Sequence, residues 1–176
     1  SEAMLTLPGG GDVLYAELIW GAAYNVGGAN VSSSISNSVT FSTPAGTYTI
    51  APSASPLTSN NRFVASANVT GLVQLAGQGR YAVKGVPASY GNDANSHAAG
   101  WTLAVVYRNT SLPTRNISIF VGAEAQGAAP AAGAGFCTPV SGLLKARALV
   151  TAIEGDARRG GDFFLFGPTS ALDTEH

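Results

Sequence analysis

Short runs in which an apolar residue recurs at every second position dominate the chain, and this spacing is the periodicity of a β-strand. The two strongest runs cover residues 101–107 and 117–121, and the polar connection between them contains Pro113. In the first run both alternating sets are mainly apolar, and one face consists of Trp101, Leu103, Val105 and Tyr107. We therefore predict a central β-hairpin over residues 101–121, whose first strand is covered on both faces.

Similar alternation elsewhere predicts several further strands. The first covers residues 13–20, with Leu14, Ala16, Leu18 and Trp20 on one face and Val13, Tyr15, Glu17 and Ile19 on the other. We expect Glu17, the one charge in this run, to lie on the solvent face or to pair with an arginine. The other predicted strands cover residues 39–41, 48–50, 62–67, 80–86, 143–153 and 163–166.

One short helical turn is predicted among these strands. It follows Asn68, with Asn68 or Thr70 as its cap, and the glycines of residues 77–79 end it. The whole pattern amounts to about nine or ten strands at roughly regular spacing, joined by long loops rich in Gly, Ser and Ala. It favours an all-β fold, an antiparallel β-sandwich that is jelly-roll-like.

The chain has the length of one domain and shows no internal repeat or compositional boundary. Its 176 residues are enough to bury a sizeable core. We assign residues 1–11 to a flexible N-terminal segment, residues 12–168 to the β-sandwich and residues 169–176 to a C-terminal tail. No apolar run reaches the roughly 18 residues that a membrane span needs, and no signal peptide is visible.

Composition narrows the class of protein. Charged residues make up only 11% of the chain, under half of the usual share of about 25%. A neutral surface rich in hydroxyl groups is typical of an exported bacterial wall or surface protein. The net charge of −1 and the scattered basic residues argue against a nucleic-acid partner. The single cysteine, Cys137, excludes an internal disulfide and a cysteine-based zinc site.

Several fragments, in a fixed order, resemble a known type of module. They are residues 14–21, 67–73, 79–83 and 100–107, followed by Glu154-Gly-Asp156 and Gly161-Asp162. Together they resemble an uncharacterised extracellular β module of large bacterial and archaeal surface proteins, which often precedes immunoglobulin-like repeats. The resemblance covers about residues 13–167. It implies a secreted or cell-surface, non-catalytic module of an adhesin-like protein, and it supplies no catalytic residues.

An acidic turn is the candidate metal site. Glu154, Asp156 and Asp162 lie in a Gly-rich stretch between two predicted strands. Calcium prefers several oxygen ligands from a flexible loop, including backbone carbonyls, which glycine lets the chain present. Arg158 and Arg159 oppose a cation in the same turn, and ion pairs with these arginines explain the carboxylates equally. No other cofactor is indicated.

A polar loop before the central hairpin supplies the candidate ligand-binding residues Asn92, Asp93, Asn95 and His97. Loops on a rigid sandwich often carry binding residues, although the same residue types also build ordinary turns. His97 is the only histidine outside the C-terminal tail, so a site with two histidine ligands is not expected.

Catalysis is not indicated by any constellation in the sequence. A serine hydrolase would have only His97 as a histidine base, and no serine lies in a Gly-x-Ser-x-Gly context. No spacing selects a pair of carboxylates for glycoside hydrolysis. An isopeptide cross-link from Lys84 or Lys145, with Glu17 as the acid, is a further hypothesis beside the simpler one of two solvated lysines.

These observations predict a structural or adhesive module of a secreted or cell-surface bacterial protein. Its expected partners are other copies of itself or neighbouring domains of a surface protein. The alternative is a carbohydrate-binding module that uses exposed aromatics, for which Tyr24, Tyr48 and Tyr90 are the candidates, whereas Trp20 and Trp101 are expected to be buried. A hydrolase is the remote third possibility.

Overall fold

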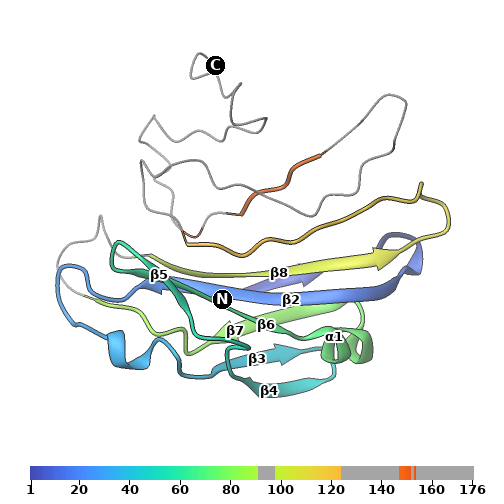
Figure 1. Cartoon of the computed structure of the whole chain (residues 1–176). Coiled ribbons are helices and arrows are strands. Elements are labelled where there is room, and N and C mark those ends of the chain that lie inside the picture. The colour runs from blue at the N-terminus through green and yellow to red at the C-terminus, as the bar shows by residue number, and fades with distance from the viewer. Residues whose placement is uncertain (91–97, 124–146, 152, 154–176) are drawn as a thin grey trace, which may run out of the picture.

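The computed structural model describes residues 1–90, 98–123, 147–151 and 153. In this part of the chain, two four-stranded antiparallel sheets pack against each other (Figure 1). The strands are β1 (Glu2–Leu5), β2 (Asp12–Ala23), β3 (Val39–Thr43), β4 (Gly46–Ile50), β5 (Leu57–Ser59), β6 (Arg62–Asn68), β7 (Gly79–Lys84) and β8 (Ala99–Arg108). One α-helix, α1 (Thr70–Ala76), and two single turns of 3₁₀ helix, Pro8–Gly10 and Ser32–Ser34, complete the regular structure.

The two sheets share the core between them. The first sheet has the order β1-β7-β3-β4 and the second the order β5-β6-β2-β8. The largest fully buried side chains come from both sheets and from α1 with the residue before it: Trp20, Tyr81, Phe41, Phe63, Leu18, Val39, Val69 and Val73. The rings of Phe41 and Tyr81 stack with centroids 5.7 Å apart. The predicted all-β sandwich is therefore confirmed in outline.

The alternation predicted for the first strand holds only in its second half. Ala16, Leu18 and Trp20 are buried as expected, but Leu14 is 51% exposed and Val13 is buried in its place. The ladder with β8 explains the difference: Val13 lies opposite Tyr107 and Tyr15 opposite Val106, so a β-bulge at Leu14 shifts the register. An extra residue in one strand reverses the faces beyond it, and only the pairing reveals it.

The predicted central hairpin is wrong in two respects. Residues 101–107 do form a strand, and Trp101, Leu103, Val105 and Tyr107 all pack against the core as expected. Within the described ranges, however, β8 pairs with β2 alone and ends the order of its sheet. Residues 117–121 are not part of a strand. Alternation specifies which side chains share a face, but it does not say which strand supplies the hydrogen bonds.

The ends of the chain also differ from expectation. Residues 1–11 were expected to be flexible, but residues 2–5 form β1 and pair with β7, so that Ala3 lies opposite Tyr81. Residues 57–59, which belong to none of the predicted strands, form β5. Residues 147–151 and 153, from the strand predicted over 143–153, are not in a strand, and the strand predicted over 163–166 lies outside the described residues.

The helix begins and ends close to the predicted residues, but its start differs in detail. Val69, which directly precedes the first turn, provides no side-chain cap, but the Asn68 Oδ1 accepts a hydrogen bond from the Thr70 amide at 3.0 Å, so the predicted contact of Asn68 with the helix start is present. The Thr70 Oγ1 accepts a hydrogen bond from the Ala16 amide at 3.0 Å, which attaches the helix to β2. Gly77, with a φ of 65°, ends the helix as predicted. No helix in the described ranges has the length and apolar composition required to cross a membrane.

Candidate functional site

The residues that the sequence singled out for binding lie outside the described part of the chain. This applies to the calcium candidates Glu154, Asp156 and Asp162, and to the loop candidates Asn92, Asp93, Asn95 and His97. Both sites therefore stay predictions. Within the described ranges, no group of three or more His, Cys, Asp or Glu residues is placed to hold a metal ion.

A groove lies on one side of the sandwich. It has a volume of about 360 Å³ and is lined by residues 1–5, Tyr81 and residues 101–103. These residues belong to β1 and β7 of the first sheet and to β8 of the second. Among the described strands, β1 and β8 end the orders of their sheets, so the groove lies at the seam between these two strands.

A hydrogen bond joins the two walls of this seam. The indole Nε1 of Trp101 donates to the Oγ of Ser1 at 2.7 Å. The N-terminal ammonium of Ser1 in turn donates to the carbonyl of Val83 at 3.2 Å. The first residues of the chain thus contact both sheets, which positions β1 across from the N-terminal half of β8.

The walls of the groove carry several apolar side chains together with the carboxylate of Glu2, which pairs with Arg80. Met4 is 64% exposed, and Leu5 and Leu103 pack partly against the core. The Tyr81 hydroxyl donates to the carbonyl of Gly77, and burial raises the pKa of this phenol above 10.0. The Tyr81 phenol therefore stays protonated and hydrogen-bonded at neutral pH.

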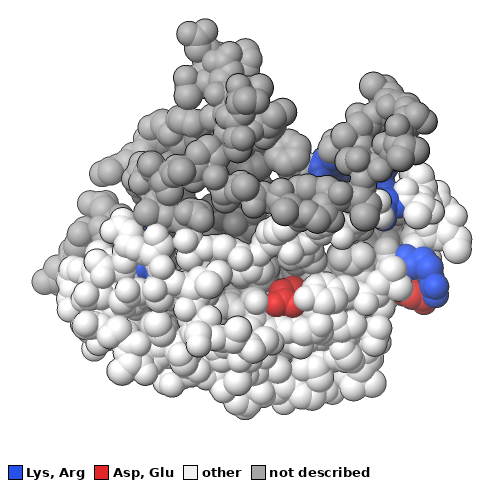
Figure 2. Space-filling view, in the orientation of Figure 1, with Lys and Arg blue, Asp and Glu red and all other residues white. Residues whose placement is uncertain are grey.

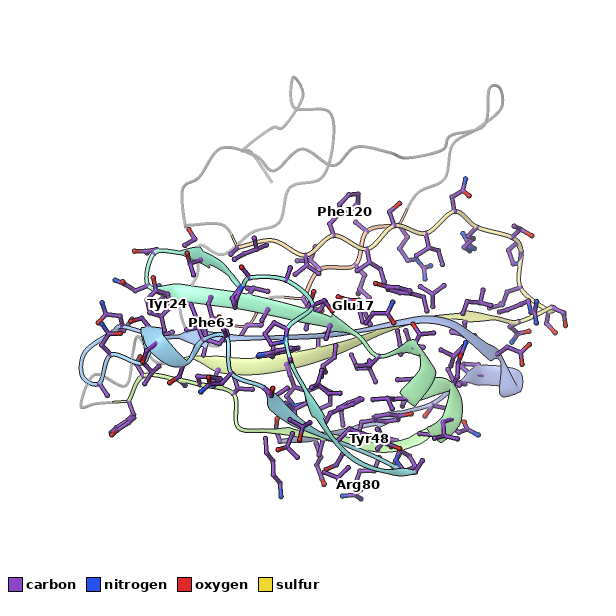
Figure 3. All side chains as sticks on the ribbon, turned by 60° about the horizontal axis from the view of Figure 1, so that its bottom comes forward. Glu17, Tyr24, Tyr48, Phe63, Arg80 and Phe120 are labelled. Atoms are coloured by element: carbon purple, nitrogen blue, oxygen red, sulfur yellow. The ribbon has the colours of Figure 1, made fainter. Side chains whose placement is uncertain are left out.

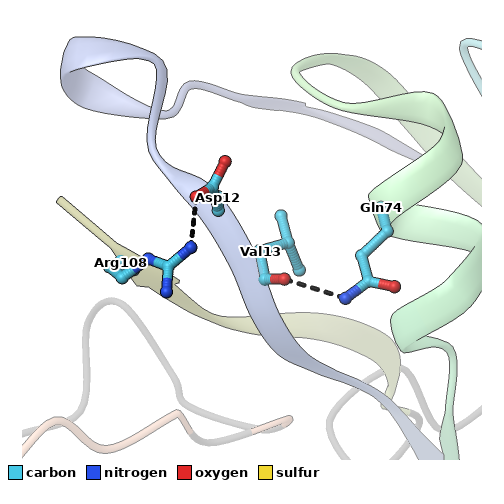
Figure 4. A network of polar contacts seen from close by, with 4 residues as sticks. All are labelled: Asp12, Val13, Gln74 and Arg108. Atoms are coloured by element: carbon cyan, nitrogen blue, oxygen red, sulfur yellow. Dashed lines mark hydrogen bonds and ion pairs between the residues drawn. The ribbon is translucent and has the colours of Figure 1, made fainter.

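A smaller hollow of about 130 Å³ lies where the N-terminal segment meets the end of β8. Arg108 donates to Asp12 at 2.8 Å, and the Nδ2 of Asn109 donates to the carbonyl of Pro8 at 2.9 Å. On the other side of β2, the Nε2 of Gln74 donates to the Val13 carbonyl at 2.9 Å, next to the bulge (Figure 4). The Asp12–Arg108 pair is largely exposed and contributes little stability, so these contacts only fix the position of the chain.

Glu17 is a buried carboxylate, so the first of its two predicted placements, on the solvent face, is wrong. Its side chain projects from the middle of β2 on the outer face of the second sheet, and the residue is only 7% exposed (Figure 3). The Tyr15 hydroxyl donates to Glu17 Oε2 at 2.5 Å. That hydrogen bond, together with burial and the charge of Glu17, raises the pKa of Tyr15.

The position of Glu17 also bears on the isopeptide hypothesis. In β7 the side chains of Tyr81 and Val83 point into the core. Lys84 belongs to the opposite set of alternating positions and is exposed, so it lies on the outer face of the first sheet. Glu17 lies on the outer face of the second sheet, and the core separates the two side chains. Lys84 therefore cannot use Glu17 as its acid. Lys145 lies outside the described residues.

Two glycines on the outer face of the second sheet lie beneath the side chain of Ile153, a residue of the C-terminal part of the chain. Gly21 of β2 and Gly100 of β8 lie directly opposite each other. A Cβ added at either position would come within 3.2 Å of the Ile153 side chain. Ile153 thus packs over the two glycines, because only residues without a side chain leave room for it.

The three candidate tyrosines do not form one platform. Tyr90 is 74% exposed, whereas Tyr24 packs partly against the core. Tyr48 belongs to β4 of the first sheet and lies far from Tyr24 (Figure 3). Trp20 is buried as predicted, but Trp101 is only half-buried because it lines the groove.

The groove escaped the sequence analysis because its N-terminal wall is a strand of only four residues. One signal was present in the other wall: residues 99–107 carry no charged residue and no proline. Natural proteins usually place charged residues or proline on an exposed strand edge, because these residues prevent pairing with another strand.

Comparison of the chain with protein-family models gave no match, and comparisons with curated proteins and with solved structures gave none either.

Proposed function

We propose that this protein is a non-catalytic structural or adhesive module of a secreted or cell-surface bacterial protein, and that it associates with other copies or with neighbouring domains. The observation that carries this proposal is a sandwich poor in charged residues, with a groove between β1 and β8 whose walls include several apolar side chains. The finer assignment, a jelly-roll-like sandwich of nine or ten strands, belongs to the same proposal, and the eight described strands are compatible with it.

The surface supports association rather than turnover. Among the described residues on the face shown in Figure 2, side chains of Lys, Arg, Asp and Glu occupy only a few separate places. A surface with little charge offers little electrostatic repulsion between copies. Apolar side chains are exposed on several elements, including Met4, Leu14, Leu57, Leu75, Leu112 and Ile117. Exposed apolar groups of this kind mark interaction surfaces when they are contiguous.

Retention on surfaces and mass in solution test the proposal together. The full chain, labelled with a fluorophore, is applied to bacterial cells and to glass, and an unrelated β-sandwich of similar charge serves as the control. Light scattering over a wide concentration range measures association in parallel. We expect retention above the control, mass that rises with concentration, or both. A chain that stays monomeric and is not retained contradicts the proposal.

A carbohydrate-binding module is the second candidate, and the exposure of Tyr90 favours it. An exposed aromatic ring beside a loop offers a sugar an apolar face to stack on, as well as a polar hydroxyl. The test is a glycan array with calcium and with a chelator. Binding that disappears in Tyr90→Ala but not in Tyr48→Ala supports this reading, and an array without any binding in either condition removes it.

A further inference from the structure

We propose that Asn30 is a modification site, at which the side-chain nitrogen accepts a sugar in an N-glycosidic bond. The pattern that N-glycosylating enzymes recognise, Asn-x-Ser/Thr, occurs four times in the chain, at Asn30, Asn68, Asn109 and Asn116. The pattern alone does not rank these positions, but their contacts in the folded chain do. Secreted proteins are the ones that carry such sugars, so this site rests on the proposed function.

The reaction joins the asparagine Nδ2 to the anomeric carbon of a sugar that is activated by a phosphate leaving group. The N–C bond forms while the bond between that carbon and the phosphate oxygen breaks. The phosphate leaves with the electron pair, and a proton passes from Nδ2 to a base of the enzyme. Nucleotide sugars and lipid-linked sugars both supply this chemistry. The enzyme has to reach the asparagine amide and the hydroxyl two positions later, so an acceptor needs both groups exposed and unengaged.

Asn30 offers both groups at the surface. It lies in the connection between β2 and β3, directly before the 3₁₀ turn Ser32–Ser34, and Asn30 and Ser32 are both exposed. The Asn30 Oδ1 accepts a hydrogen bond from the Ser32 amide at 2.9 Å, which uses the oxygen of the carboxamide and leaves its nitrogen. Among the described residues, neither the Asn30 Nδ2 nor the Ser32 hydroxyl takes part in a hydrogen bond.

The backbone on either side of Asn30 fixes this presentation. The Val31 amide donates to the Tyr24 carbonyl at 2.8 Å. The Ala29 amide donates to the Tyr90 carbonyl at 3.1 Å. Both flanking residues are half-buried, whereas Asn30 between them is exposed. The connection is thus held against the body of the sandwich on both sides, and the Asn30 side chain is left towards solvent.

Asn109 has the same pattern but is closed by its contacts. Its Nδ2, the atom that would carry the sugar, donates to the Pro8 carbonyl at 2.9 Å. Its Oδ1 accepts a hydrogen bond from the Ser111 amide at 2.9 Å. Space around the nitrogen is also short, since a Cβ added at Gly9 would lie 2.8 Å from it. A sugar on Asn109 would break the contact that joins the end of β8 to the N-terminal segment.

The remaining two positions are also engaged. Asn68 is exposed, but the hydroxyl of its pattern belongs to Thr70 in the first turn of α1, and that hydroxyl oxygen accepts a hydrogen bond from the Ala16 amide at 3.0 Å. An enzyme would have to detach the helix from β2 to use it. Asn116 is exposed as well, but it already takes part in an interaction of its own. Asn30 is therefore the preferred acceptor of the four.

A sugar at Asn30 would suit the rest of the surface. Charged residues make up only 11% of the chain, so charge contributes less than usual to its solubility. An N-linked sugar is bulky and solubilising. Asn30 lines neither the groove nor the smaller hollow, so a sugar there leaves both accessible.

Glycosylation of the folded full chain in vitro tests the site. One arm uses a transferase that takes nucleotide sugars, the other a transferase that takes lipid-linked sugars, and a short acceptor peptide verifies that each enzyme is active. Mass spectrometry of the digested chain locates the sugar. We expect it on Asn30 in at least one arm, which also identifies the class of donor.

Matched variants separate the site from its surroundings. Asn30→Gln should abolish the modification, and Asn109→Gln should leave it unchanged. Ser32→Ala keeps Asn30 and removes only the hydroxyl, so it should also abolish the modification, and Ser32→Thr should restore it. Four short peptides, one for each position, provide the reference without the fold, and they should show no preference for the peptide that contains Asn30.

Three outcomes overturn the inference. The first is no sugar on Asn30 in either arm although both enzymes modify their acceptor peptide. The second is sugar on Asn109 of the folded chain as readily as on Asn30, and the third is a preference for Asn30 that is already present among the peptides. Surface retention of a chain without sugar at Asn30 would leave the proposed function intact. A chain that carries the sugar but is neither retained nor associated would contradict the proposed function alone.

Discussion

The paired glycines Gly21 and Gly100 should respond very differently to the same substitution. At Gly21 an added Cβ would lie 2.3 Å from the carbonyl oxygen of Phe63, a backbone atom of the neighbouring strand. At Gly100 the nearest atom is Cγ2 of Ile153 at 3.2 Å, which belongs to a side chain that can move by a few tenths of an ångström. The first contact requires the β2–β6 ladder to shift, and the second does not.

The magnitudes follow from two opposing effects. Replacing glycine by alanine reduces the entropy of the unfolded chain and stabilises a protein by about 0.4–1 kcal/mol where the backbone allows it. Overpacking costs about 1–3 kcal/mol. We therefore expect Gly21→Ala to lower the free energy of unfolding by up to about 2.5 kcal/mol, and Gly100→Ala to change it by less than about 0.5 kcal/mol.

Urea unfolding followed by tryptophan fluorescence measures both values, and equal slopes with denaturant would confirm that the unfolded states are comparable. Ile153→Ala provides the control, because it should remove the strain of Gly100→Ala in a double variant but not that of Gly21→Ala. The reasoning fails if Gly100→Ala is as destabilising as Gly21→Ala. A double variant without coupling between residues 100 and 153 would show that Ile153 does not pack over the glycines.

Further predictions concern the core, pH, the acidic turn and covalent structure. Phe63→Ala should cost about 3–5 kcal/mol because the ring is 1% exposed, whereas Leu75→Ala on the surface should stay within about 0.5 kcal/mol, both measured by urea unfolding. The hydrogen bond to a neighbouring carboxylate, with burial and that carboxylate's charge, raises the pKa of Tyr15 above 10.0. The stability that the protonated Tyr15 phenol contributes is therefore fully present below pH 10 and is lost as the pH rises through the folded-state pKa. Thermal melts at alkaline pH should show this loss in the wild type, and Tyr15→Phe should abolish it. Thermal melts with calcium and with a chelator should coincide if ion pairs hold the turn at residues 154–162, and a higher midpoint with calcium would instead assign a metal site. Peptide mapping should recover Lys84 unmodified, and a cross-linked peptide from that residue would contradict its placement on the outer face.

The candidate site illustrates what local pattern can and cannot reveal. Alternation in residues 101–107 correctly gave the face that meets the core, because side chains in any strand point alternately to opposite sides. It did not reveal that β8 pairs with β2 and with no other described strand, since that depends on which distant segments become its neighbours. The groove depends further on β1, whose four residues carry too little pattern to be recognised before the pairing with β7 is known.

The sequence by itself determined the all-β class, most strand positions, the helix with its glycine stop at residue 77 and the inward face of β8. These properties depend on neighbours a few residues apart along the chain. Tertiary structure alone decided the bulge at Leu14, the burial of Glu17, the packing of Ile153 over two glycines and the groove between β1 and β8. Each of these requires contacts between residues far apart in sequence, and the alternation of apolar residues carries no information about which strands become neighbours.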